Sequence, residues 1–189
     1  MQRLLNHILM TAVEMLIALP AVAGSNDILD SKPINSYSAV QLPKWQKLIS
    51  AHTQQSYRVT APNIQKWNDF ILSIKGETKL RQMMKVNLWF KRFPYKQDNW
   101  VYKQDDYWAT PAEFLTKGGD CEDYATIKYM SLKKLGFNPK DMKIAMVYDV
   151  YSGTDHAFLI VKNEGVEYVL DNREKMVVAR YMKKRYKPH

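Results

Sequence analysis

The only cysteine of the chain, Cys121, lies between acidic residues in the segment GGDCEDYA, residues 118–125. Asp120 precedes it, and Glu122 and Asp123 follow it. Negative neighbours raise the pKa of a thiol because they repel the thiolate. A lone thiol cannot form an internal disulfide, so it is an apolar filler, as free cysteines commonly are, an intermolecular link or a reagent.

The break in the chain before Cys121 favours a reactive thiol. Gly118, Gly119 and Asp120 are typical of a chain that turns before a helix begins, which places Cys121 in the first helical turn. The unpaired backbone N–H groups and the dipole of a helix start lower the pKa of a thiol there. The same N–H groups can hold the oxyanion of an acyl-transfer reaction.

A nucleophilic thiol needs a base and a group that orients the base. His156 begins a β-rich run at 156–162, and Asp171 directly follows the next run, 166–170. If the two runs are neighbouring antiparallel strands, Asp171 lies beside His156, and both can join Cys121 in a Cys-His-Asp triad. The spacing alone leaves open a packing cysteine, a histidine that only hydrogen-bonds and an acid that only ends a strand.

The elements that would position these residues change from helical to extended along the chain. Residues 121–135 are typical of a helix that ends at Gly136, and β-rich runs follow at 143–150, 156–162 and 166–170. The short connections between the runs predict an antiparallel meander. The sequence therefore predicts an α+β fold in which the helix 121–135 packs on the sheet.

The segments before this helix are also predicted to be mostly helical. Proline-initiated or amphipathic runs occur at 43–56, 63–76, 77–93 and 110–117. Apolar side chains at helical spacing are expected to face the core in the second and third runs. They are Ile64, Trp67, Ile71 and Ile74 in the second run and Leu80, Met83, Met84, Leu88 and Trp89 in the third.

Residues 94–111 lack a helical period and are expected to form a long irregular loop, a kind of segment that is often functional. Its aromatic residues Trp100, Tyr107 and Trp108 either line a cleft for an extended peptide or cover the core. A side chain of this loop or of residues 86–90 is expected to be the second oxyanion donor.

Residues 1–23 have the three parts of a secretory signal, with cleavage expected after Ala23. An uncleaved membrane anchor is the alternative, although Glu14 and the short length argue against a spanning helix. Residues 24–42 are a polar leader, and residues 43–189 are predicted to form one domain.

The formal net charge is +9, and the last 17 residues, 173–189, hold seven basic residues and one acid. We expect this end to be a solvated basic tail, with binding to an acidic partner or an anionic lipid as the alternative. An exported protein that carries no DNA- or RNA-binding motif is not expected to bind nucleic acid.

The motifs resemble a known family. DYWATPAEFLTKGGDCEDYATIKYMSLKKLGF, residues 106–137, followed by HAFLIV and LDN, is similar to bacterial transglutaminase-like cysteine peptidases of the LapG type. The resemblance covers about residues 60–175 and implies a papain/transglutaminase-like fold. It also implies that Cys121 is the nucleophile, His156 the general base and acid, and Asp171 the orienting group.

The resemblance further implies a periplasmic, calcium-dependent endopeptidase. Family members cleave the N-terminal region of large surface adhesins at a di-alanine-containing site, which disperses biofilm, and an inner-membrane cyclic-di-GMP receptor sequesters them. By the same resemblance Asp120, Glu122 and Asp123 are Ca²⁺ ligands, since Ca²⁺ prefers oxygen-rich sites. Their alternative role is a helix cap and first-turn acids without a metal.

Two other functions use the same residues. A transglutaminase would share the triad and pass the acyl group to a lysine in place of water. A catalytically silent, calcium-responsive binding module would keep the acids and have an inert thiol.

Overall fold

The computed structural model describes residues 42–56 and 62–188. The predicted signal, residues 1–23, and residues 24–41 of the predicted leader lie outside the described residues, so the structure does not test them. Within the described ranges, no helix combines the length and hydropathy that a membrane span requires.

Six α-helices precede the sheet among the described residues. They are α1 (Pro43–Ser56), α2 (Pro62–Ile74), α3 (Lys79–Phe90), α4 (Asp98–Val101), α5 (Pro111–Lys117) and α6 (Cys121–Lys134). Each predicted helical run overlaps one of them, and the predicted loop 94–111 contains the short α4 and ends at the first residue of α5. The start of α5 is a capping box, in which the side chains of Thr110 and Glu113 each accept from the other's backbone N–H.

The strands form one antiparallel sheet in the order β4-β3-β2-β1-β5. Its members are β1 (Met142–Asp149), β2 (Thr154–Asn163), β3 (Val166–Leu170), β4 (Val177–Val178) and β5 (Tyr186–Pro188). The 3-10 helix η2 (Pro139–Asp141) leads into β1, and η3 (Ala179–Tyr181) follows β4. The predicted meander is confirmed, because β1 pairs with β2 and β2 with β3, all antiparallel.

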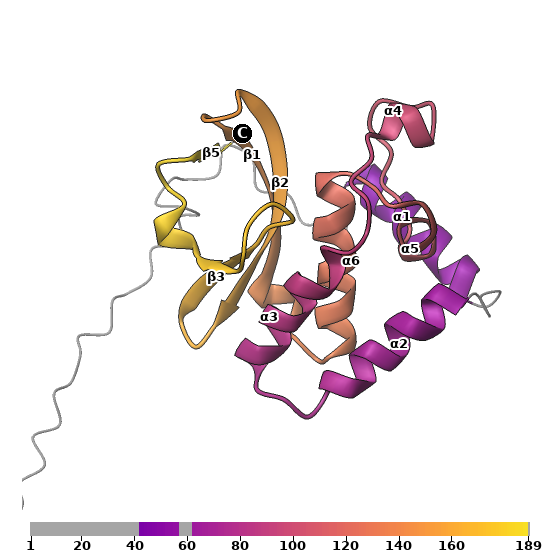
Figure 1. Cartoon of the computed structure of the whole chain (residues 1–189), viewed down its shortest axis with the longest axis horizontal. Helices are drawn as coiled ribbons and strands as arrows, with labels where there is room; N and C mark the ends of the chain where they lie inside the picture. The colour runs from indigo at the N-terminus through magenta and orange to yellow at the C-terminus, as the bar shows by residue number, and fades with distance from the viewer. Residues whose placement is uncertain (1–41, 57–61, 189) are drawn as a thin grey trace, which may run out of the picture.

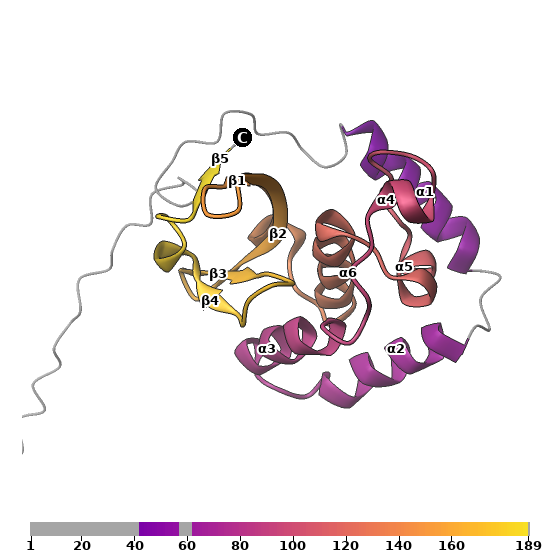
Figure 2. The same cartoon turned by 45° about the horizontal axis from the view of Figure 1, so that its top comes forward.

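Helix α6 lies between the sheet and helices α1 and α5 in both views of the chain (Figures 1 and 2). It packs against β1 and β2 of the sheet and also against α3 and α5. One apolar core joins the helices to the inner sheet residues, including Leu159 and Val161. A second, smaller core covers the opposite sheet face, where Phe158 and Ile160 meet Met182 and Tyr186.

The predicted basic end is solvated, since six of its seven basic residues are exposed, but it is folded onto the sheet. Residues 173–188 contain β4, η3 and β5, and β5 pairs with β1 at the sheet edge (Figure 2). Arg185 donates from Nε and Nη2 to the buried carboxylate of Asp149, and Arg173 donates to the same group. Arg185 and Arg173 therefore fasten this segment to the sheet, which the charge count could not reveal.

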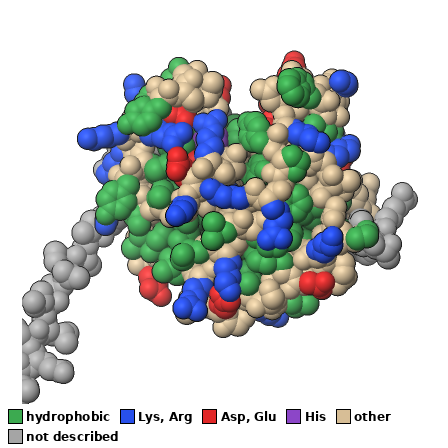
Figure 3. All heavy atoms as spheres, viewed as in Figure 1, with side chains coloured by type: hydrophobic (Ala, Val, Ile, Leu, Met, Phe, Trp, Pro, Cys, Tyr) green, Lys and Arg blue, Asp and Glu red, His purple; other side chains and the backbone are tan. Residues whose placement is uncertain are grey.

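The predicted buried stripe of α3 is correct only in part. Met83 is fully buried, but Leu80, Met84 and Leu88 are 39%, 46% and 53% exposed. The face that packs inward carries Met83, Val86 and Phe90, so the buried stripe is rotated by about one residue from the predicted one. Figure 3 shows apolar side chains among the lysines and arginines on the face viewed in Figure 1.

Candidate active site and acidic cluster

The chain turns sharply before the first residue of α6, which is Cys121. Gly118 has φ +83°, and a β-carbon there would lie 2.2 Å from the carbonyl oxygen of Pro94. Only glycine accepts both this conformation and this contact. Residues 94–96 lie alongside Gly119, to whose carbonyl oxygen the backbone N–H of Lys96 donates at 2.9 Å.

His156 and Asp171 come together in the interior. Nε2 of His156 lies 2.9 Å from Oδ1 of Asp171, and both side chains are completely buried. Asp171 also accepts from the backbone N–H of Arg173 and from the hydroxyl of Tyr186, each at 2.9 Å. Burial raises the pKa of Asp171, but the hydrogen bonds, led by that of His156, outweigh burial and hold the pKa at about 2.

The tautomer of His156 follows from this arrangement. An ionised carboxylate can only accept a hydrogen bond. The proton of the imidazole is therefore on Nε2 of His156, which donates to Asp171. Nδ1 is then the basic nitrogen. It is buried and has no hydrogen-bond partner among the described residues.

The thiol of Cys121 lies at the strand that carries His156 but is not hydrogen-bonded to the imidazole. The backbone of Ala157, the residue after His156, lowers the pKa of this thiol by hydrogen bonding. The thiol donates to Oε2 of Glu122 at 3.3 Å. Burial raises the pKa of this thiol, and the charges of Glu122 and Asp120 raise it further. In this arrangement the sulfur holds its proton.

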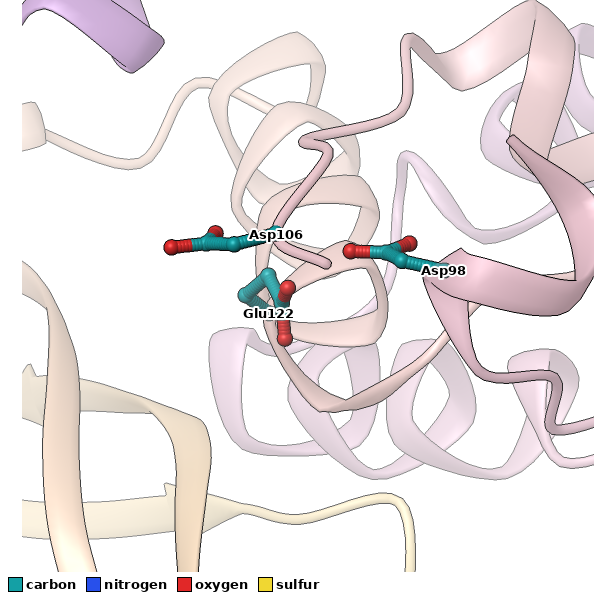
Figure 4. Close-up of side chains that lie close together, drawn as sticks. All are labelled: Asp98, Asp106 and Glu122. Atoms are coloured by element: carbon teal, nitrogen blue, oxygen red, sulfur yellow. The ribbon is translucent and has the colours of Figure 1, made fainter. Parts of the chain in front are cut away.

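Carboxylates gather at the start of α6 in two overlapping groups. Asp98, Asp120 and Asp123 each place one oxygen within 4.8 Å of the others, and Asp98, Asp106 and Glu122 do the same. Figure 4 shows the carboxylate of Asp98 directed from α4 toward the start of α6, where Glu122 and Asp106 lie.

The first group has the features of a cation site. Oδ1 of Asp98, Oδ1 of Asp120 and Oδ2 of Asp123 are buried and have no hydrogen-bond partner among the described residues. Such oxygens are costly to bury unless a donor or a cation satisfies them. In the second group, by contrast, exposed Asp106 pairs with Lys44, and Glu122 accepts from the thiol.

The alternative role of these acids as helix caps does not describe what they contact. Asp120 is the N-cap residue of α6, but its side chain makes no capping hydrogen bond. Oδ1 of Asp123 accepts from the backbone N–H of Ala109, at 2.7 Å, and thereby ties the end of the loop to α6.

Burial raises the pKa of each acid near the thiol. It raises the pKa of Asp98 to about 6, and it raises those of Asp120, Glu122 and Asp123 as well. Mutual repulsion adds to burial for these groups. Positive charge at this place would therefore stabilise several carboxylates together.

The structure separates the predicted metal-site acids. Asp120 and Asp123 share one group, whereas Glu122 belongs to the other. Sequence reasoning missed Asp98, which is common to both groups. The signal that could have found it is an acid in the loop predicted to be functional, although its 22-residue separation from Asp120 gave no reason to join them.

Comparison with known proteins shows the family of the chain. Residues 59–187, more than half of the chain, match the family model of the bacterial transglutaminase-like cysteine proteinases. The chain belongs to this family. No curated protein sequence matches the chain.

Solved structures of LapG from Legionella pneumophila share the fold of this cysteine proteinase. The calcium-bound form is 27% identical, with a TM-score of 0.61, and the match covers 74% of this chain and 81% of that one. A second LapG structure is 28% identical, with a TM-score of 0.60 and the same coverage. The EGTA-treated form is 27% identical, with a TM-score of 0.60, and the match covers 74% of this chain and 78% of that one. The transglutaminase-like fold predicted from the motifs is thereby confirmed.

The aromatic residues of the loop differ in their surroundings. Trp108 packs partly against the core and meets Trp45 edge-on, so it covers the core of the proteinase. Trp100 is 75% exposed and does neither. Tyr107 and Trp108 also line a cavity of about 240 Å³ that lies against α1 and includes Asp106 in its wall.

Proposed function

We propose that the chain is an exported, calcium-dependent cysteine endopeptidase in which Cys121, His156 and Asp171 form the catalytic triad. The observation that carries this proposal is the fully buried His156–Asp171 hydrogen bond, which leaves Nδ1 of His156 free on the strand against which the thiol lies. A histidine that only packed would not need a buried carboxylate with two further donors.

In the proposed reaction each residue of the triad has one task. Nδ1 of His156 takes the proton of Cys121, and the thiolate attacks the carbonyl carbon of a peptide bond. His156 then gives this proton to the leaving amine. Water, deprotonated by the same nitrogen, hydrolyses the thioester and restores the thiol. Asp171 stays ionised throughout, and it stabilises the imidazolium and keeps the proton on Nε2.

The backbone N–H groups at the start of α6 are the proposed site of the oxyanion. They carry the positive end of the helix dipole and lie next to the sulfur. A second donor from residues 86–90 is less favoured than we expected, because the Nδ2 of Asn87 donates at 3.2 Å to the carbonyl oxygen of Glu174.

Asp98, Asp120 and Asp123 are the residues proposed to hold Ca²⁺, with Glu122 beside them. Their unpartnered buried oxygens form a purely oxygen donor set, which suits a hard cation. Bound calcium supplies positive charge that offsets these acids. With that repulsion offset, the pKa of Cys121 would be lower, because the charges of Glu122 and Asp120 add to the effect of burial on the thiol.

We further propose that the enzyme acts in the periplasm on the N-terminal region of a large surface adhesin and so controls biofilm attachment. An inner-membrane cyclic-di-GMP receptor is its proposed regulator. Family membership and the similarity to LapG support these assignments. The predicted secretory signal, residues 1–23, supports export.

The test is cleavage of N-terminal fragments of the host's large surface adhesins. The wild-type enzyme with Ca²⁺ is expected to yield two products whose new terminus follows a small residue. C121A, shown by circular dichroism to be folded, is expected to be inactive, and EGTA is expected to abolish wild-type cleavage. Cleavage by C121A would refute the triad.

The two other functions give different outcomes in the same experiment. Cross-linked products, whose masses equal the sum of donor and acceptor minus ammonia, would indicate a transglutaminase. A binding module would give no products, and its Cys121 would react with iodoacetamide no faster than free cysteine at mildly acidic pH.

A further inference from the structure

Lysine 128 is completely buried in the middle of α6, where a charged side chain is uncommon. Only 1% of Lys128 is exposed. It lies seven residues after Cys121, so both residues are on one face of the helix, two turns apart. Helix α6 packs against β2, the strand that carries His156.

Lys128 reaches from α6 to the end of β3. Its Nζ donates to the carbonyl oxygen of Leu170 at 3.2 Å, and Leu170 directly precedes Asp171. The ammonium also lies 5.8 Å from the centre of the Tyr124 ring. The contact therefore joins the helix that carries the thiol to the residue next to the orienting carboxylate.

The charged groups around Lys128 shift its pKa in opposite directions. Burial lowers its pKa to about 7, the negative charge of Asp171 raises it, and the positive charge of Lys91 at the end of α3 lowers it. Burying an amine is unfavourable for folding, and an apolar side chain of similar size would fill the same space at lower cost. Packing alone therefore gives no reason for a lysine here.

We propose that Lys128 is a positioning residue of the active site, which holds the end of β3 against α6 so that Asp171 stays within hydrogen-bonding distance of His156. This inference rests on the proposed triad. Lys128 touches none of the reacting atoms and acts through Leu170 and Asp171. Its loss is expected to loosen Asp171 without removing a substrate contact.

The test compares K128M with K133M, which changes an exposed lysine of the same helix. With Ca²⁺ present, K128M is expected to have a Tm no lower than that of wild type, because methionine fills the space without a buried charge. Its kcat for the adhesin fragment is expected to fall roughly ten- to a hundredfold, the loss that a misplaced catalytic group brings, with KM unchanged. K133M is expected to match wild type in Tm, kcat and KM.

A second readout needs no substrate and separates this proposal from the proposed function. Alkylation of Cys121 by iodoacetamide is expected to be about tenfold slower in K128M, because a loosened Asp171 makes His156 a poorer base. In a double-mutant cycle, D171N and K128M are expected to be non-additive, since both act on one hydrogen bond.

Wild-type kcat and a wild-type alkylation rate in K128M, with D171N impaired, would overturn the proposal while leaving the triad intact. Additive losses, or a lower Tm without a lower kcat, would also overturn it, because they indicate a purely structural lysine. If K128M does not fold, K128Q is measured in the same way. Its polar amide is neutral, and its side chain is one bond shorter than that of lysine. Cleavage by C121A would refute the triad instead, and the alkylation rates would still test Lys128.

Discussion

The carboxylate of Asp123 occupies the space that a side chain at position 119 would need. A β-carbon built on Gly119 would lie 2.2 Å from Oδ2 of Asp123 and 2.7 Å from its Cβ. That oxygen is one of the three buried, unpartnered carboxylate oxygens at the start of α6. The second glycine of the GGDCEDYA segment therefore makes room for a proposed metal ligand.

We predict that G119A weakens calcium binding. The added methyl group must displace Asp123, and such changes behind a ligand typically cost about 10- to 100-fold in metal affinity. Isothermal titration calorimetry measures the effect, and G76A is the control, because nothing lies within 4 Å of a β-carbon at position 76. Equal calcium affinities for G119A and G76A would show that Asp123 is not a ligand.

Asp98 is predicted to be a ligand as important as the acids beside Cys121. D98N removes one negative charge from the donor set, so the dissociation constant for calcium is expected to rise by at least about tenfold. In EGTA the variant is expected to be more stable than wild type, because it buries one repelling charge fewer.

The control for D98N is D105N, which changes an exposed acid of the same loop. Thermal unfolding in EGTA gives the stability without calcium. The rise of the Tm on adding Ca²⁺ reports calcium binding, since a ligand that binds only the folded state raises the Tm. If the Tm of D98N rises on adding calcium as much as that of D105N, Asp98 lies outside the site.

Features of the fold that depend on neighbouring residues in the sequence could be predicted, and features that depend on distant residues could not. The break at Gly118, the cap at Thr110 and the strand runs are local signals, and the structure has a turn, a capping box and an antiparallel meander there. The place of Asp98 beside Asp120 depends on how the loop 94–111 folds back on α6. No periodicity or turn signal encodes that arrangement.

The C-terminal segment illustrates the same limit. Its basic residues are predicted to be solvated, and most of them are, but nothing in the sequence pairs Arg185 with Asp149 or Tyr186 with Asp171. Those pairs form because β5 adds to the free edge of β1, next to the active site. A short segment that reads as a tail thus contributes a donor to the proposed catalytic acid.

We predict that Y186F lowers activity although the residue lies in this segment. The hydroxyl of Tyr186 is one of three donors to Asp171, and a hydrogen bond to a charged group contributes about 1.5–3 kcal/mol. Loss of the bond is expected to lower kcat by about tenfold, which corresponds to the lower end of that range, with little change in KM. The phenyl ring keeps its stacking on His156, so the fold is expected to persist.

Steady-state kinetics on the adhesin fragment measure this effect, and Y181F is the control. Tyr181 is 70% exposed and lies in the same segment, away from Asp171. Wild-type kcat in Y186F would mean that His156 and the backbone N–H of Arg173 hold Asp171 without help from β5.

The depressed pKa of Asp171 predicts a specific loss of stability in acid. The folded-state pKa is about 2, below the ordinary value of 3.8, so the folded chain binds fewer protons than the unfolded chain between these values. The stabilisation from Asp171 is therefore complete above about pH 4 and is lost as the pH falls through about 2. A pKa difference of this size corresponds to about 2 kcal/mol of free energy of unfolding.

D171N isolates this contribution because asparagine does not titrate. Urea unfolding in EGTA at pH 5, 4, 3 and 2 gives the free energy of unfolding of each form, and EGTA keeps calcium release from adding to the pH dependence. Asp149, whose pKa is also low, is common to both forms and cancels in the comparison. The wild-type advantage over D171N is expected to shrink by about 2 kcal/mol from pH 5 to pH 2. A difference that stays constant over this range would mean that Asp171 is not held as an ionised partner of His156, and the proposed tautomer would be wrong.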